Sequence, residues 1–145
     1  MTVKLKAILL LVLAAAILGM AACAADAPSA PPSSSTAAES AAVYRRITPE
    51  KAKERIDSGD PVVILDVRTP AEFKEEHIPG ALLLPNESIV ATPPVELPDL
   101  NAEILVYCRT GNRSRQAAEK LIKMGYTMVF DFGGIESWPY ETVKG

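Results

Sequence analysis

The chain has 145 residues, which is enough for one domain and little more. Its formal net charge of −3 provides no basic excess of the kind that nucleic-acid binding requires. With 1 histidine and 2 cysteines, the sequence offers no ligand cluster for a metal ion, so we expect no metal site.

The first 22 residues have the pattern of a secretory signal peptide. Lys4 and Lys6 form a basic head, and residues 7–22 (AILLLVLAAAILGMAA) are uncharged and end on small residues. This apolar run is shorter than the roughly 20 residues that a membrane-spanning helix needs. We therefore expect a signal peptide at residues 1–22, rather than an uncleaved anchor helix, and hence export to the periplasm or cell surface.

Cys23 directly follows Met20-Ala21-Ala22, an arrangement that resembles a bacterial lipobox, although leucine is more usual at the Met20 position. The resemblance implies lipidation of Cys23, so that acyl chains alone hold the protein on a bacterial membrane. The alternative is ordinary cleavage near Cys23, which leaves an incidental cysteine. If Cys23 is acylated, Cys108 is the only free thiol of the exported chain and no internal disulfide can form.

The segment after Cys23 is composed almost entirely of Ala, Ser and Pro (residues 24–42, AADAPSAPPSSSTAAESAA). Such a segment cannot bury enough apolar surface to order itself. We therefore expect residues 23–42 to form a disordered tether and residues 43–145 to form the folded domain.

The domain sequence predicts four helices. Two begin at a hydroxyl cap followed by proline, at Thr48-Pro49 and Thr69-Pro70, and the first of these should run to about residue 57. A third helix is expected over 114–124, with Gly125 as its C-terminal stop. Gly133-Gly134 should open a last short helix that runs through Trp138.

Continuous apolar runs predict strands that are buried on both faces, at residues 62–65, 81–84, 104–107 and 128–130. The proline-rich segment 85–101 should contain little regular structure. Alternating strands and helices indicate an α/β fold in which a parallel sheet is flanked by helices on both faces. Sites in such folds lie beyond the carboxyl ends of strands, and Cys108 directly follows one of them.

The chemistry-bearing segment is the loop Cys108-Arg109-Thr110-Gly111-Asn112-Arg113. A helix N-terminus after this loop offers unpaired N–H groups and partial positive charge, and a tight turn at Gly111 can direct successive amides inward. Together with the two arginines, these effects favour the thiolate of Cys108 over the thiol and attract an oxyanion. We therefore expect Cys108 to be a nucleophile. The alternative is a buried core cysteine beside two solvated arginines.

Four blocks of sequence, in order, resemble the rhodanese-like single-domain sulfurtransferases over residues 44–145. They are Asp66-Val67-Arg68, Glu72-Phe73 with His77-Ile78-Pro79-Gly80-Ala81, Cys108 to Arg113 followed by Ser114, and Gly133-Gly134 with Trp138. The resemblance implies a rhodanese-like fold, with Cys108 as the catalytic residue and the remaining loop residues as the substrate-binding set: Arg109, Thr110, Gly111, Asn112 and Arg113. A signal peptide before a single such domain is similar to periplasmic members of the family.

The resemblance also implies roles for residues outside the loop. It gives Asp66 and Arg68 a supporting role, and it places His77 in a structural turn. From the residues alone, Asp66 and Arg68 could equally form a structural ion pair, or Arg68 could pair with Glu72. We expect Trp138 to anchor the core rather than to contact substrate.

Loop length separates two chemistries among the families that this loop resembles. The sulfurtransferases have a loop of six residues, as in Cys108 to Arg113, whereas the related cell-cycle phosphatases have one residue more. The implied reaction moves sulfane sulfur from thiosulfate or a similar donor, through a Cys108 persulfide, to a thiol or cyanide, with no cofactor. The alternatives are a non-catalytic rhodanese-like binding module and, less favoured, an oxyanion phosphatase or reductase.

Overall fold

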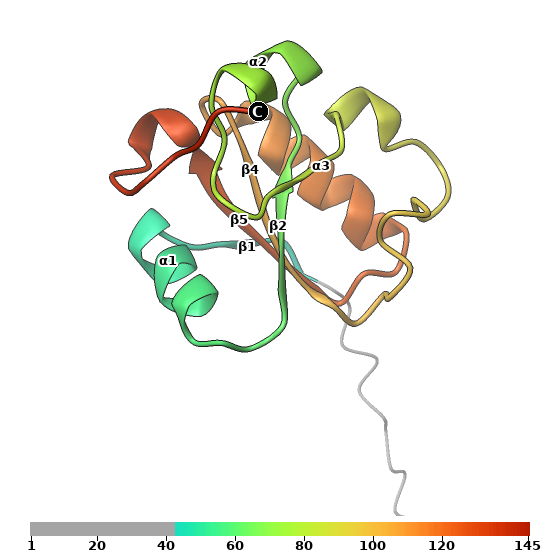
Figure 1. Cartoon of the computed structure of the whole chain (residues 1–145). Helices are drawn as coiled ribbons and strands as arrows, with labels where there is room; N and C mark the ends of the chain where they lie inside the picture. The colour runs from blue at the N-terminus through green and yellow to red at the C-terminus, as the bar shows by residue number, and fades with distance from the viewer. Residues whose placement is uncertain (1–42) are drawn as a thin grey trace, which may run out of the picture. The chain divides into compact units, whose positions relative to one another are not determined.

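The computed structural model describes residues 43–145, so the expected signal peptide, Cys23 and the tether lie outside the described residues. Figure 1 shows the elements in chain order. They are β1 (Arg45–Arg46), α1 (Pro49–Asp57), β2 (Val62–Asp66), α2 (Pro70–Glu75), β3 (Leu82–Leu83), η1 (Asn86–Ser88), β4 (Glu103–Cys108), α3 (Asn112–Lys123), β5 (Met128–Gly134) and η2 (Ile135–Ser137). Of these, η1 and η2 are short 3₁₀ turns.

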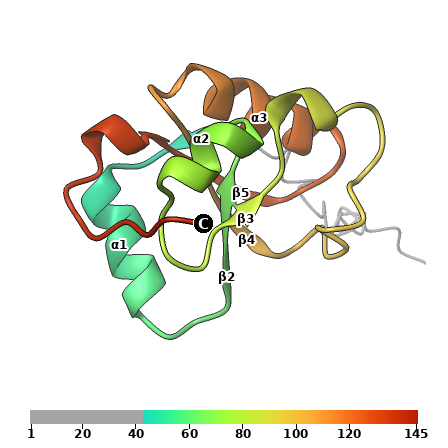
Figure 2. The ribbon, with the colours of Figure 1, turned by 45° about the horizontal axis from the view of Figure 1, so that its top comes forward.

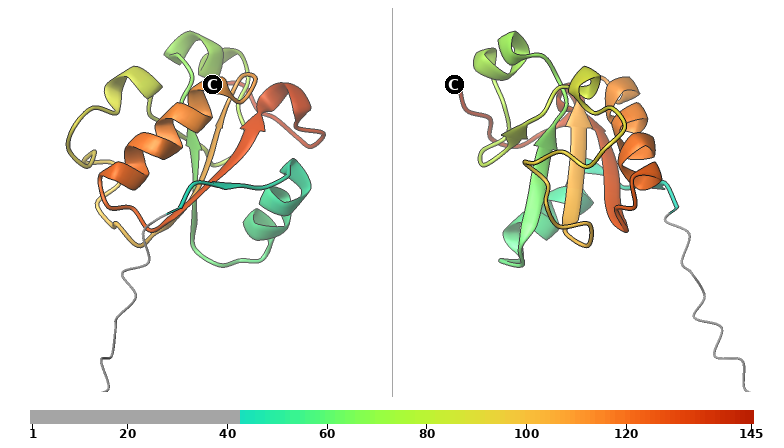
Figure 3. Two further views of the ribbon diagram at one scale, coloured as in Figure 1. Left: turned by 180° about the vertical axis from the view of Figure 1, so that it is seen from behind. Right: turned by 90° about the vertical axis from the view of Figure 1, so that its right-hand side faces the viewer.

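The described strands form one parallel sheet in the order β1-β5-β4-β2-β3, with β4 at its centre. Figure 3 shows α3 on one face of the sheet and α1 on the other. The prediction of a parallel sheet covered on both faces is therefore confirmed. The sequence did not indicate β1, because Arg45 and Arg46 form no apolar run, although their backbone pairs with Phe130 and Asp131 of β5.

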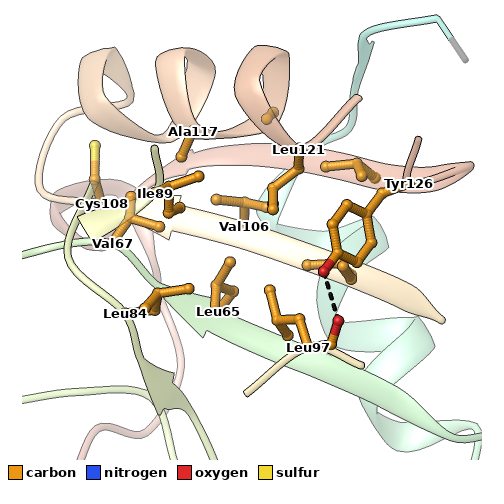
Figure 4. Packing of buried hydrophobic residues seen from close by; sticks show 13 residues of the cluster. Leu65, Val67, Leu84, Ile89, Leu97, Val106, Cys108, Ala117, Leu121 and Tyr126 are labelled. Carbon is orange, nitrogen blue, oxygen red and sulfur yellow. Dashed lines mark hydrogen bonds between the residues drawn. The ribbon is translucent and has the colours of Figure 1, made fainter. Parts of the chain in front are cut away.

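The core has two parts, one on each face of the sheet. Beneath α3, Leu65, Val106 and Leu121 pack with Cys108 at the end of the cluster (Figure 4). On the α1 face, Tyr107 and Phe132 pack with Trp138, which is 8% exposed, so the predicted core role of Trp138 is confirmed.

The segment 85–101 has one short 3₁₀ turn, in agreement with its prolines, but it is not a surface loop throughout. Ile89 and Leu97 are buried in the cluster beneath α3. The buried Tyr126 hydroxyl donates a hydrogen bond to the carbonyl of Leu97, which fixes the segment against the core (Figure 4).

Both predicted helix starts are confirmed by side-chain caps. Thr48 Oγ1 accepts a hydrogen bond from the amide of Lys51, and Pro49 occupies the first turn of α1. Thr69 and Glu72 form a reciprocal capping box at the start of α2.

Figure 2 shows the C-terminal segment returning to α2, where the amide of Gly145 donates to the carbonyl of Lys74.

The structure corrects three predicted boundaries. β5 continues through Gly133-Gly134, which therefore do not open a helix, because they pair with Tyr107 and Cys108. Only the 3₁₀ turn Ile135–Ser137 follows. Helix α3 begins at Asn112 instead of residue 114, since Gly111 in a left-handed conformation serves as its cap. The strand expected at 81–84 contains only Leu82–Leu83, both partly buried at the edge of the sheet.

Within residues 43–145, no helix combines the length and apolar character that crossing a bilayer requires.

Candidate active site

Cys108 is the last residue of the central strand β4, at the carboxyl end of the sheet. It pairs with Gly134 of β5, and the preceding Tyr107 pairs with Asp66 at the end of β2. Figure 4 shows the Cys108 side chain beside the start of α3. The residue is only 1% exposed, so its sulfur lies below the surface of the surrounding loop.

The loop after Cys108 folds back onto the sulfur. Gly111 has a φ of 102°, in the left-handed region that favours glycine, and its amide donates a hydrogen bond to Cys108 Sγ over 3.1 Å. The amide is thereby placed to donate to negative charge that develops on the sulfur. The expected turn at Gly111 and its inward-facing amide are both present.

The other backbone amides of the loop can donate hydrogen bonds to a bound anion. Within residues 43–145, the backbone N–H groups of residues 110, 112, 113 and 114 donate no hydrogen bond. Three of them form the first turn of α3, where the helix also presents partial positive charge. This arrangement can bind an oxyanion next to the sulfur.

Ser114 contacts the sulfur from the helix side, a contact that sequence reasoning did not predict. Its buried Oγ lies 3.7 Å from Cys108 Sγ, 3.1 Å from the carbonyl of Gly111 and 3.2 Å from the carbonyl of Gly133. The hydroxyl can therefore accept from the thiol or donate to the thiolate. The sequence feature that could have indicated this contact is the position of Ser114, a small hydroxyl residue about one helical turn after Gly111.

A β-bulge brings β5 close to the loop. Val106 pairs with Asp131, but Tyr107 pairs with Gly133, so Phe132 is an extra residue on β5. As a result, a Cβ atom at Gly134 would lie 2.2 Å from the carbonyl oxygen of Arg109, which only glycine avoids.

The two loop arginines point to carboxylates on different elements. Arg109 Nε lies 2.9 Å from Oε1 of Glu136, and both side chains are more than half exposed. Arg113 makes two hydrogen bonds of 2.8 Å and 2.7 Å to Glu72, with both side chains about three-quarters buried. Hydrogen bonding from Arg113 lowers the pKa of Glu72 to about 2. In the described structure, Arg113 is therefore already paired.

Asp66 and Arg68 form a buried ion pair at the end of β2. Arg68 Nη2 lies 2.7 Å from Asp66 Oδ2, and Nε lies 3.0 Å from both carboxylate oxygens. Arg68 also donates to the carbonyl of Glu76 over 2.6 Å. The ion-pair interpretation is therefore confirmed, and the alternative in which Arg68 pairs with Glu72 is wrong, because Glu72 binds Arg113.

A second buried carboxylate, which the sequence did not single out, supports the other side of the loop. Asp131 accepts hydrogen bonds from the Tyr44 hydroxyl over 2.6 Å and from the amide of Gly133 over 2.9 Å. Burial, followed by the interaction with Asp131, raises the pKa of Tyr44 to about 12. This network joins the residue before β1 to the part of β5 that contacts the loop.

His77 occupies a structural position. Its ring stacks on Phe73 with centroids 3.8 Å apart, and its Nδ1 lies 2.9 Å from the carbonyl of Phe73. Its backbone exchanges hydrogen bonds with Val143. These contacts fasten the C-terminal segment to the end of α2.

A pocket of about 280 Å³ opens beside the loop, next to Arg109. Its lining residues are Arg68, Glu72, Glu75, Glu76, Arg109, Ile135 and Glu136. The described residues contain no group of three or more His, Cys, Asp or Glu side chains placed to hold a metal ion.

The profile of the rhodanese-like domain family matches residues 48–140, which include the loop and every element from α1 to β5. The chain belongs to this family. Among curated relatives of this rhodanese-like chain, thiosulfate sulfurtransferase GlpE of Pseudomonas syringae is 37% identical over 107 residues, covering 70% of this chain and 97% of the relative. Thiosulfate sulfurtransferase PspE of Escherichia coli is 38% identical over 81 residues, covering 56% and 78%.

Solved structures give the same family assignment. A rhodanese-like domain protein from Staphylococcus aureus is 30% identical with a TM-score of 0.61, covering 70% of this chain and 98% of that one. A rhodanese with anions from E. coli is 37% identical with a TM-score of 0.51, covering 57% of this chain and 98% of that one. The predicted rhodanese-like fold is therefore confirmed.

Proposed function

We propose that this rhodanese-like protein is a sulfurtransferase that carries sulfane sulfur as a persulfide on Cys108. The observation that carries the proposal is the hydrogen bond from the Gly111 amide to Cys108 Sγ, within a loop whose neighbouring amides are unpaired. A thiolate beside a set of unused N–H donors suits attack on a sulfur oxyanion. The relatives named thiosulfate sulfurtransferase support thiosulfate as the donor.

The reaction proceeds in two transfers with one covalent intermediate. The Cys108 thiolate attacks the outer sulfur of thiosulfate, a bond forms between the two sulfurs, and the S–S bond of thiosulfate breaks with its electron pair leaving on sulfite. A terminal persulfide anion remains on Cys108. Cyanide or an acceptor thiolate then attacks the outer sulfur and takes it away, which regenerates the Cys108 thiolate.

Each part of the loop has a task in these steps. The Gly111 amide stabilises the negative charge on Cys108. The Ser114 hydroxyl, which donates to backbone carbonyls and lies 3.7 Å from the sulfur, can turn to donate to the thiolate as well. The amides of Thr110, Asn112 and Arg113 bind the oxygens of the donor and then the persulfide anion, while the guanidiniums of Arg109 and Arg113 add positive charge at the rim. Because Cys108 is 1% exposed, donor entry requires the residues around the sulfur to give way.

The assay is thiocyanate formation from thiosulfate and cyanide by the purified protein. We expect ping-pong kinetics, with no turnover by Cys108→Ser. Hydrolysis of an aryl phosphate in the absence of thiocyanate formation would overturn the proposal in favour of a phosphatase.

The burial of Cys108 is the observation that favours a second candidate, a non-catalytic rhodanese-like module that binds a sulfur compound or a partner. Such a module would bind thiosulfate without breaking its S–S bond. Release of sulfite in a single turnover, with no acceptor present, supports the enzyme, and reversible binding without sulfite release supports the module.

We propose separately that the protein is exported and held on a membrane through lipid on Cys23. The support is the sequence pattern of residues 1–23. Palmitate labelling that disappears in Cys23→Ser supports the anchor, whereas an unlabelled exported protein would contradict it.

A further inference from the structure

In the described structure a carboxylate opposes the charge of each loop arginine, and the two ion pairs differ in burial and in the number of hydrogen bonds. The pair between Arg109 and Glu136 is exposed and makes a single contact, so solvent and salt screen it. The pair between Arg113 and Glu72 is bidentate and largely buried, so it is fixed in geometry and only weakly screened.

Glu72 is held by its own helix as well as by Arg113. Its Oε2 accepts hydrogen bonds from the amide of Thr69 over 3.0 Å and from the Thr69 hydroxyl over 2.8 Å, as part of the α2 capping box. The carboxylate therefore cannot follow Arg113 without breaking the cap. It keeps the guanidinium at a set place between α2 and the loop.

Arg113 is close enough to Cys108 for their charges to interact. The pKa of Arg113 is raised chiefly by its hydrogen bonds to Glu72, and negative charge on Cys108 adds to the effect. A guanidinium in this position would attract an anionic donor, and the Glu72 carboxylate beside it opposes that attraction.

We infer that Glu72 is a specificity-determining positioning residue, which holds Arg113 and offsets its charge so that the loop does not favour doubly charged sulfur donors over singly charged ones. This inference rests on the proposed sulfurtransferase function and concerns donor choice at the same site. The attraction of a fixed charge for a donor grows with the donor's charge. Removing the Glu72 charge should therefore strengthen binding of thiosulfate, a dianion, more than binding of an organic thiosulfonate, a monoanion.

The test compares KM and kcat of Glu72→Gln for thiosulfate and for benzenethiosulfonate, in low salt. Glutamine retains an oxygen that can accept from the Thr69 amide, so the cap is preserved. We expect the KM for thiosulfate to fall about fivefold, the KM for the monoanion to fall about twofold, and kcat to change less than either. High salt should reduce both effects.

Glu75→Gln is the matched control. Glu75 lies on the same helix and lines the same pocket, but it is exposed and its side chain makes no hydrogen bond or ion pair within residues 43–145. Removing its charge should change the thiosulfate KM less than twofold. If both variants lower KM equally, the effect belongs to the overall charge of the pocket and the inference is wrong.

Arg113→Gln and the double variant Glu72→Gln/Arg113→Gln test whether Glu72 acts through Arg113. Arg113→Gln leaves an unopposed carboxylate and should raise the thiosulfate KM, while the double variant should return it to within about twofold of wild type. A purely structural role for Glu72 predicts losses in kcat and stability without opposite changes in KM, and that pattern would overturn the inference. Absence of turnover in the wild-type protein would instead refute the proposed function.

Discussion

The amide of Gly111 donates a hydrogen bond to the sulfur of Cys108 over 3.1 Å, from a residue whose φ is 102°. The left-handed turn and the hydrogen bond are one feature, because the turn directs this amide back to the end of β4. Glycine adopts that conformation at little cost, whereas other residues lose free energy in it.

Replacing Gly111 by alanine should therefore impair the site more than the fold. A side chain is strained at a φ of 102°, and its Cβ would also touch Gly133 Cα at 3.4 Å, so relief of the strain would shift the loop against β5. We expect stability to fall by about 1 kcal/mol and sulfur transfer to fall at least tenfold. Gly59→Ala is the control, since Gly59 also has positive φ but open space around it, and it should lose stability alone. Equal activity of the two variants would contradict this role for Gly111.

Ser114→Ala should slow formation of the persulfide. The variant removes the hydroxyl that lies 3.7 Å from Cys108 Sγ, and we expect the rate of sulfite release in a single turnover to fall about tenfold. Ser137→Ala removes a hydroxyl that donates to the carbonyl of Gly134 without contacting the sulfur. If Ser137→Ala slows sulfite release as much, the effect is a general loosening of the loop.

Asp66→Asn should destabilise the protein strongly, because it leaves the buried Arg68 guanidinium without its counter-charge. We expect the free energy of unfolding to fall by about 3 kcal/mol in denaturant titrations. Glu54→Gln, which removes one partner of the exposed pair with Lys51, should cost at most about 1 kcal/mol. A small effect of Asp66→Asn would show that Arg68 finds other partners.

The pair between Glu72 and Arg113 should make stability depend on acid pH. The pKa of Glu72 is about 2 in the folded protein, below the ordinary value of 4.5, because Arg113 hydrogen-bonds to its carboxylate. The stabilisation is therefore fully present above pH 4.5 and is lost as the pH falls toward 2. The difference in unfolding free energy between wild type and Glu72→Gln should stay constant near neutral pH and shrink below pH 4.5. A gap that persists down to pH 2 would mean that the charge of Glu72 is not what stabilises the pair.

Local sequence patterns predicted much of the fold because its helix starts and strands have local causes. Thr69 with Pro70 indicates a cap, and the run from Val62 to Leu65 indicates a strand buried on both faces. The extension of β5 through Gly133-Gly134 could not be predicted, since two glycines normally indicate a turn. Their strand pairing depends on β4, which is distant in sequence.

The loop residues of the site could be predicted from the sequence, but their partners from distant elements could not. The loop residues are contiguous, so their shared position follows from the sequence. The partners of its arginines do not, because Glu72 and Glu136 reach the loop only through the packing of α2 and η2. The carboxylate of Asp131 was missed for the same reason, as its partner Tyr44 lies just before β1, 87 residues away in sequence.

Persulfide formation is tested most directly by the intact mass of the protein after incubation with thiosulfate and removal of excess donor. A persulfide predicts the gain of one sulfur atom per chain, located on Cys108, absent from Cys108→Ser and removed by cyanide. A protein whose mass does not change, or an adduct that persists in Cys108→Ser, would contradict the claim that this loop holds a persulfide.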